Sequence, residues 1–143
     1  MSADDVAAVR KTRNAWRVAG LPARGQVHHG LTLKALGAQV RQAVVQGGVC
    51  LLEVQLRHRD GSDAGAVPRL MTVTGVEVDA QPSRRVRALM LLDPSDDLPW
   101  GAGHNTRLPI TGAPEHAVLR YTNGRLLRFR VRRLIEWRAA PSP

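Results

Sequence analysis

The stretch from Leu70 to Pro94 constrains the fold of this chain more than any other. Two apolar runs, the first rich in β-branched residues, flank a Gln81–Ser83 break, and the second run ends abruptly at Asp93. Apolar runs of this length, separated by turn residues, are typical of β-strands. The pattern predicts two antiparallel strands that are neighbours in a sheet, with the Asp93 carboxylate at the end of the second strand.

Two helices are predicted before this pair of strands. Ser2 is placed to cap the first helix, whose first turn carries two aspartates that suit the positive end of a helix dipole. Thr32 is expected to cap the second helix, in which apolar residues recur every three or four positions until Gly47. His28 and His29, between the helices, are expected to be solvated in a loop, because no second histidine pair stands at ligand spacing.

A further strand is predicted from Val49 to Leu56, directly after the second helix. Cys50, Leu52 and Val54 alternate along it and would share one face. Cys50 is therefore expected to be a small core residue, because a nucleophilic cysteine needs an accessible, electropositive setting.

Near the C-terminus, Asn123-Gly124 lies between two apolar alternations, which is a strong signal for a β-hairpin. In the second strand of this hairpin, Phe129 and its apolar neighbours would face inward. The arginines that alternate with them, such as Arg128 and Arg130, would form an outward row.

Length and composition predict one domain over residues 1–143. Apolar residues make up 43% of the chain, which supports a packed core. The single cysteine fits a reducing compartment. No apolar run approaches the ~20 residues of a membrane span, and the acidic start of the chain is unlike a signal peptide. We expect a soluble cytoplasmic protein with no membrane partner.

The charge of the chain is strongly positive, at +9 with a pI near 11.4. A basic surface attracts nucleic acid, and a row of arginines would be available for it: Arg120, Arg125, Arg128, Arg130 and Arg132. However, only Lys11 and Lys34 are lysines, and such an arginine bias often follows codon composition. The row also lacks interleaved aromatic side chains for base stacking. A nucleic-acid partner is therefore possible but not favoured.

Other common sites are not supported by the sequence. Asp93, Asp96 and Asp97 are close together, but they do not have the spacing of a calcium loop. Gly101 and Gly103 are only a fragment of a phosphate-binding pattern. We expect neither a metal nor a cofactor.

The expected order of elements is two N-terminal helices followed by an antiparallel sheet of about five strands, an α+β fold. Several segments of the chain resemble those of a known family. They are the helix ending in Gly-Gly, the runs VCLLEV, MTVTGVE and ALMLLDP, and a later Pro-Trp-Gly. They resemble the second half of a bacterial papain-like cysteine peptidase of the double-glycine leader-peptide type, over residues 33–108. The resemblance implies a papain-like C-terminal half.

The resemblance also implies positions for the catalytic residues. Asp93 matches the acid that orients the catalytic histidine, but Arg69 stands where the family has that histidine. Arginine cannot act as a general base, because it stays protonated at physiological pH. The family's nucleophile lies at the start of an N-terminal helix, and this chain has no cysteine before Cys50. His58 is the histidine that a rearranged loop could bring near Asp93.

Three classes of function follow. The first is a non-catalytic papain-like module, a pseudoenzyme, that binds a peptide or protein partner with Asp93, Arg69, Trp100 and His104 along the edge of its sheet. The second is an active cysteine peptidase whose nucleophile is Cys50 or comes from a separate chain. The third is the basic nucleic-acid-binding module.

Overall fold

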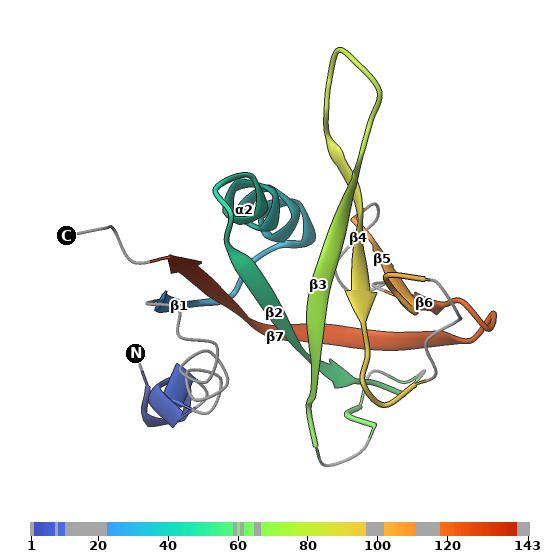
Figure 1. Cartoon of the computed structure of the whole chain (residues 1–143). Coiled ribbons are helices and arrows are strands. Elements are labelled where there is room, and N and C mark those ends of the chain that lie inside the picture. The colour runs from blue at the N-terminus through green and yellow to red at the C-terminus, as the bar shows by residue number, and fades with distance from the viewer. Residues whose placement is uncertain are drawn as a thin grey trace.

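A computed structural model describes residues 2–7, 9–10, 23–58, 60, 62–64, 67–96, 102–110 and 118–139 (Figure 1). Residues 3–7 and 9–10 are helical, and one further helix, α2, spans Leu33–Val45. The strands are β1 (Ala23–His29), β2 (Val49–Leu56), β3 (Arg69–Val78), β4 (Val86–Leu92), β5 (Thr106–Pro109), β6 (Val118–Tyr121) and β7 (Leu126–Ala139).

The strands form one antiparallel sheet that closes on itself. Its order is β1-β7-β2-β3-β4-β5-β6, and β6 also pairs with β7. Closure depends on the length of β7, whose first residues pair with β6 while its later residues pair with β2 and β1. The result is a six-stranded barrel, with β1 added as a seventh strand beside the far part of β7 (Figure 1).

The predicted α+β fold with a papain-like C-terminal half is therefore wrong. The structure is mostly β, and its sheet is a closed barrel rather than the open sheet of about five strands that we expected. The physical reason is a pairing between segments far apart in the chain. Leu56 of β2 lies opposite Phe129, and Leu119 of β6 lies opposite Leu127, so β7 joins both edges of the sheet. Local periodicity carries no signal for such a pairing.

Two strands were not predicted. Residues 23–29, including His28 and His29, which were expected in a loop, form β1, which is held by seven register pairs with β7 although Val27 is its only large aliphatic residue. Thr106–Pro109 forms β5 beside β4. Both strands are specified by a partner strand more than by their own sequence.

The central prediction, that β3 and β4 are antiparallel neighbours, is confirmed. Their register shifts between Val73 and Gly75, which marks a β-bulge. Val78, at the end of β3, is 44% exposed. Beyond this point the two strands leave the barrel and form the long hairpin that projects past α2 in Figure 1.

Helix α2 has the predicted caps. The Thr32 side chain accepts a hydrogen bond from the Ala35 amide, and Gly47 has a positive φ of 73° just after the helix ends. The buried face of the helix, which includes Leu36 and Val40, packs against β4, β2 and β7. No helix in the described part of the chain is long and apolar enough to cross a membrane.

A close approach sets where α2 lies on the barrel. A Cβ added at Gly37 would lie 3.2 Å from side-chain atoms of Val86 and 3.3 Å from Ile110. Val86 begins β4, and Ile110 follows the end of β5. Helix α2 therefore covers the end of the barrel where β4 begins and β5 ends.

Candidate functional site

A buried carboxylate lies at the opposite end of β4 and β5. Asp93, which is fully buried, accepts a hydrogen bond at Oδ2 from Nη1 of Arg69 at 2.9 Å and another from the Tyr121 hydroxyl at 2.6 Å. Its Oδ1 accepts from the backbone amide of Ser95 at 2.9 Å. The side chain of Asn105 then bonds to the backbone amide and carbonyl of Asp93, both at 2.8 Å.

Strand alternation explains why these residues meet. Arg69 shares a strand face with the buried Met71, and Tyr121 shares one with the buried Leu119. Asp93 continues the face of Leu91 beyond the end of β4. All three side chains therefore point into the barrel and form a polar plug at this end.

Neighbouring groups in the plug keep Asp93 ionised and Tyr121 neutral. Burial alone would raise the pKa of Asp93, but the hydrogen bonds from Tyr121, Ser95 and Arg69 outweigh it and lower this pKa. Burial and the neighbouring Asp93 carboxylate raise the pKa of Tyr121 to about 12. In the plug, the ionised Asp93 carboxylate is therefore hydrogen-bonded to the Arg69 guanidinium and to the neutral Tyr121 phenol. This arrangement stabilises the fold.

The proposed catalytic residues are not assembled around Asp93. Arg69, which stands where the resemblance implied a histidine, is bonded directly to the Asp93 carboxylate. His58 is exposed just after β2, and in the described residues its side chain makes neither a hydrogen bond nor an ion pair with Asp93. The charged groups that act on the Cys50 thiol are Glu136 and Arg138.

Cys50 is fully buried on β2, as its alternation with Leu52 predicted. Burial, together with the nearby Glu136 carboxylate, raises the pKa of Cys50 to about 12. A thiol in this setting is almost wholly protonated at neutral pH and is shielded from substrate. Its surroundings favour the expected core role over that of a nucleophile.

The remaining predicted binding residues are His104 and Trp100. His104 is partly exposed next to Asn105, whose amide bonds to Asp93, while Trp100 lies outside the described residues. The described residues contain no group of three or more histidine, cysteine or carboxylate side chains placed to hold a metal ion.

The row of arginines predicted on β6 and β7 is partly neutralised. Arg125 pairs with Asp96 at 2.5 Å and lies over the ring of Tyr121. Arg130 pairs with Asp63 at 3.1 Å, and Arg132 lies 3.5 Å from Glu53. Arg120 and Arg128 are exposed and have no ion pair with a described carboxylate. Ion pairing thus leaves few of these charges available to a polyanion.

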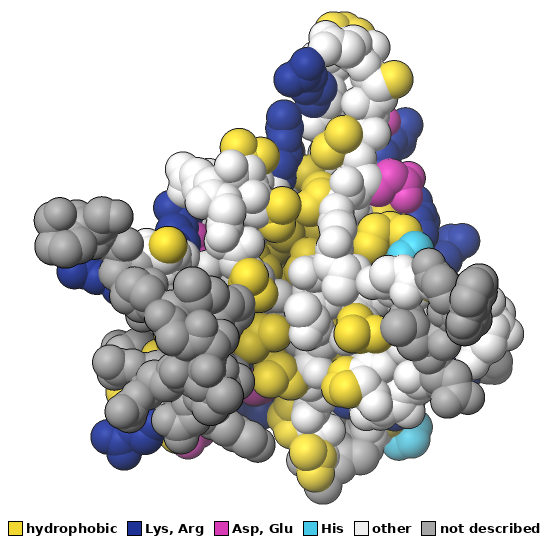
Figure 2. Space-filling model, viewed as in Figure 1, with side chains coloured by type: hydrophobic (Ala, Val, Ile, Leu, Met, Phe, Trp, Pro, Cys, Tyr) yellow, Lys and Arg dark blue, Asp and Glu magenta, His cyan; other side chains and the backbone are white. Residues whose placement is uncertain are grey.

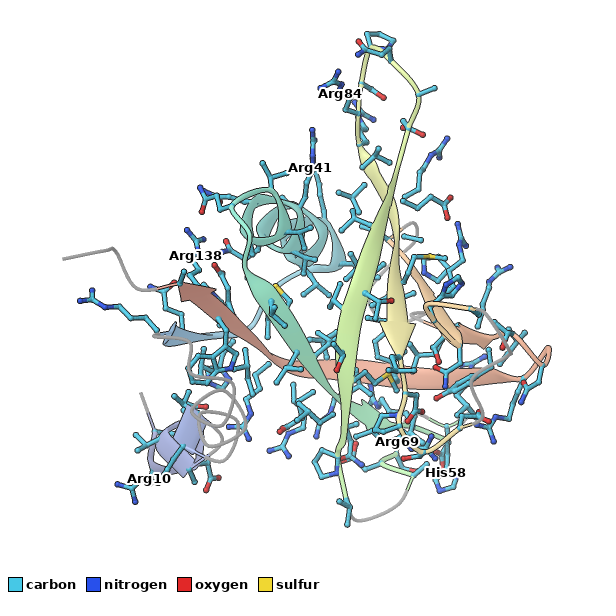
Figure 3. The ribbon with its side chains drawn as sticks, viewed as in Figure 1. Arg10, Arg41, His58, Arg69, Arg84 and Arg138 are labelled. Carbon is cyan, nitrogen blue, oxygen red and sulfur yellow. The ribbon has the colours of Figure 1, made fainter. Side chains whose placement is uncertain are left out.

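A groove lies between α2 and the β3–β4 hairpin and is surrounded by a different set of cations. We call this groove the helix–hairpin groove. It has a volume of about 610 Å³. Lys34 and Arg41 line it from the helix, and Arg84 and Arg85 line it from the hairpin. Figure 3 shows Arg41 and Arg84 on the facing sides of the helix and the hairpin, and Nη1 of Arg41 donates to the Arg84 carbonyl oxygen at 2.8 Å.

The floor of the helix–hairpin groove is apolar. Ala38, Val86 and Ile110 line it between the charged walls. Figure 2 shows apolar side chains in the furrow between the helix and the hairpin, with Lys or Arg side chains beside it. The groove therefore offers hydrophobic contact and positive charge together.

The cations of the groove are largely without anionic partners. Among the described residues, Lys34, Arg41, Arg84 and Arg85 make no ion pair with a carboxylate. The carboxylate that lines the groove, Asp79, is bonded to Arg87 and accepts from Ser83 at 3.2 Å. The groove consequently has an excess of positive charge that an anionic ligand could neutralise.

Sequence analysis did not identify this groove. A signal was present on the helix, because Lys34, Ala38 and Arg41 are spaced by four and three residues and so share one exposed face. Nothing local in the sequence shows that the Arg84-Arg85 pair would lie opposite this face.

A second hollow, of about 360 Å³, lies beside the N-terminal helical residues. Its charges pair with one another: Arg133 bonds to Asp5 and to Glu53, each at 2.8 Å, and His29 bonds to Asp5 at 2.9 Å. This hollow joins the start of the chain to the barrel, and its charges are balanced.

Comparison of the chain with protein-family models, with curated proteins and with solved structures finds no significant match.

Proposed function

We propose that this chain is a non-catalytic binding module that holds an acidic segment of a protein partner in the helix–hairpin groove. The observation that carries the proposal is a set of cations, Lys34, Arg41, Arg84 and Arg85, that have no anionic partner among the described residues and stand around an apolar floor. Arginine forms strong, often bidentate, hydrogen bonds with carboxylates, and such bonds are favourable where the surroundings exclude water.

The apolar floor supports a protein segment over a nucleic acid. A nucleic acid would meet the arginines with phosphates, but its bases need exposed aromatic side chains on which to stack. The described aromatic residues, Tyr121, Phe129 and Trp137, are all buried. An acidic peptide with apolar residues complements both the walls and the floor of the groove.

The buried setting of Cys50 supports the non-catalytic part of the proposal. A peptidase needs a thiolate that a substrate can reach, together with a base to generate it. Cys50 has no exposed surface, and Arg69 rather than a base is bonded to Asp93.

The test uses an array of synthetic 12-residue peptides whose contents of acidic and apolar residues vary independently. Fluorescently labelled full-length protein should bind best to peptides that contain both. The double variant Arg84→Glu/Arg85→Glu should weaken this binding about tenfold or more, since each charge-assisted hydrogen bond contributes roughly 1.5–3 kcal/mol.

The matched control is Arg120→Glu/Arg128→Glu, which changes the charge equally on β6 and β7. It should leave peptide binding within about twofold of the wild type, because exposed charges at a distance are screened by salt. Equal losses in both double variants would overturn the proposal. Tighter binding to a 20-base-pair DNA duplex than to every peptide would assign the groove to nucleic acid instead.

A further inference from the structure

Along α2, the helix–hairpin groove continues into an adjoining hollow of about 350 Å³, which is not the one beside the N-terminal helical residues. This hollow shares Ala38 and Arg41 with the groove and extends past them to Gln42, Val45 and Gln46. We call it the valine hollow. The two hollows together follow one face of the helix from Lys34 to Val45.

The two parts differ in chemistry. Around the helix–hairpin groove stand Lys34, Arg84 and Arg85. Of the described residues that line the valine hollow, only Arg41, at the shared boundary, is charged. Val45 at its far end is 78% exposed, although it lies on an ordered helix. A lone exposed valine is ordinary on a protein surface, but this one borders a hollow that is continuous with a cationic groove.

From this continuity we propose that the partner segment carries an apolar side chain that packs on Val45, a few residues from the acidic side chains that meet Arg84 and Arg85. This inference rests on the proposed function and specifies the partner further. It describes a short linear motif with an acidic part and an apolar anchor, bound along α2.

The dimensions of the helix limit the spacing within the motif. The eleven residue-to-residue steps from Lys34 to Val45 span about 16 Å at roughly 1.5 Å per step. An extended chain covers this length in about five residues. From Arg41 to Val45 the separation is about 6 Å, or about two extended residues. The apolar anchor should therefore lie within about five residues of the acids.

Charge opposes a second copy of this chain as the occupant. Each copy carries a formal net charge of +9, and the site to be filled is itself cationic. Bringing two such surfaces together would be opposed by repulsion between like charges.

The experiment is a mutant cycle on the protein and on a fluorescein-labelled peptide, measured by fluorescence anisotropy. One peptide has three glutamates followed by a leucine two residues later, flanked by serine and glycine, and the second has alanine in place of the leucine. With wild-type protein, the leucine peptide should bind about fivefold to tenfold more tightly, as expected for burial of about half of a leucine side chain.

The protein variants are Val45→Ser and, as a matched control, Val67→Ser. Val67 is 79% exposed and lies in the segment before β3, away from α2. Val45→Ser should reduce the preference for leucine to about twofold or less, whereas Val67→Ser should leave it unchanged. Both valines are exposed, so neither substitution should unfold the protein.

The outcomes separate this inference from the proposed function. If both peptides bind equally and Arg84→Glu/Arg85→Glu abolishes both complexes, the apolar anchor is refuted while the acidic groove stands. If neither peptide binds the wild-type protein at millimolar concentration, the inference is overturned for this spacing and the peptide array decides the proposed function. A leucine preference that survives Val45→Ser places the anchor elsewhere and also refutes the inference.

Discussion

Arg41 and Arg84 join the helix to the hairpin: Nη1 of Arg41 donates to the backbone carbonyl oxygen of Arg84 at 2.8 Å. The two residues are 43 positions apart in the chain. Arg84 has a positive φ of 43°, which residues other than glycine rarely adopt. This bond holds the part of the hairpin that carries Arg84 and Arg85 against the groove.

Replacing Arg41 with methionine should loosen the hairpin, because methionine keeps the apolar stem but cannot donate the hydrogen bond. The amide of Asp79, which donates to the Arg85 carbonyl oxygen at 2.8 Å, should exchange its hydrogen several-fold faster. Hydrogen exchange measured by NMR would report it. The control Arg128→Met, an exposed arginine on β7, should not alter this amide, and equal exchange rates in the two variants would contradict the assigned role of Arg41.

Replacing Asp93 with asparagine should destabilise the barrel by about 2–4 kcal/mol, because it leaves the Arg69 guanidinium without its anion at a partly buried site. The free energy of unfolding in urea would measure the loss. Asp63→Asn is the matched control, since the Asp63–Arg130 pair is largely exposed and should contribute less than about 1 kcal/mol. Similar losses in both variants would show that Asp93 has no special structural role.

The same plug predicts how stability depends on pH. The lowered pKa of Asp93 means that the folded state resists protonation, so its contribution is present above about pH 4 and is lost as the pH falls further. The pKa of Tyr121, raised to about 12, acts in the opposite direction. Its contribution is complete below the unfolded value of about 10 and is lost as the pH rises toward 12.

The free energy of unfolding in urea, measured across the pH range, gives a curve of stability against pH. Its acid and alkaline limbs test the two contributions. Tyr121→Phe should flatten the alkaline limb, and Asp93→Asn should flatten the acid limb. Unchanged limbs in these variants would mean that other groups control the titration.

Cys50 should react slowly with a thiol reagent at neutral pH, because its side chain is fully buried and its pKa is raised to about 12. The rate of modification by Ellman's reagent should rise by orders of magnitude in urea, where the thiol is exposed. Fast modification of the native protein, together with peptide hydrolysis that is lost in Cys50→Ala, would revive the peptidase hypothesis.

Local sequence signals predicted most elements of this fold but not β1, β5 or the closure of the barrel. The Thr32 cap, the alternation around Cys50 and the turn before Val86 each depend on neighbours in the chain, and the helix and strands that they predict are present. Strand β1 was missed because it is specified by pairing with β7, and the barrel was missed because β6 and β2 both pair with β7.

The candidate site shows the same division. Asp93 was predicted at the end of a strand, and it is there, but its partners Arg69 and Tyr121 stand 24 and 28 residues away. The groove combines a helix face with a hairpin that is remote in sequence, so its charges converge only in three dimensions. The prediction of a papain-like fold was wrong because short apolar motifs specify strands without specifying how the strands connect.

An NMR titration of the ¹⁵N-labelled full-length protein with the best-binding acidic peptide from the array would locate the surface that binds the peptide. We expect the largest chemical-shift changes on the amides of Lys34, Ala38, Arg41, Arg84 and Arg85. Changes concentrated instead on Arg120 and Arg128 of β6 and β7, with the groove amides unmoved, would contradict this expectation.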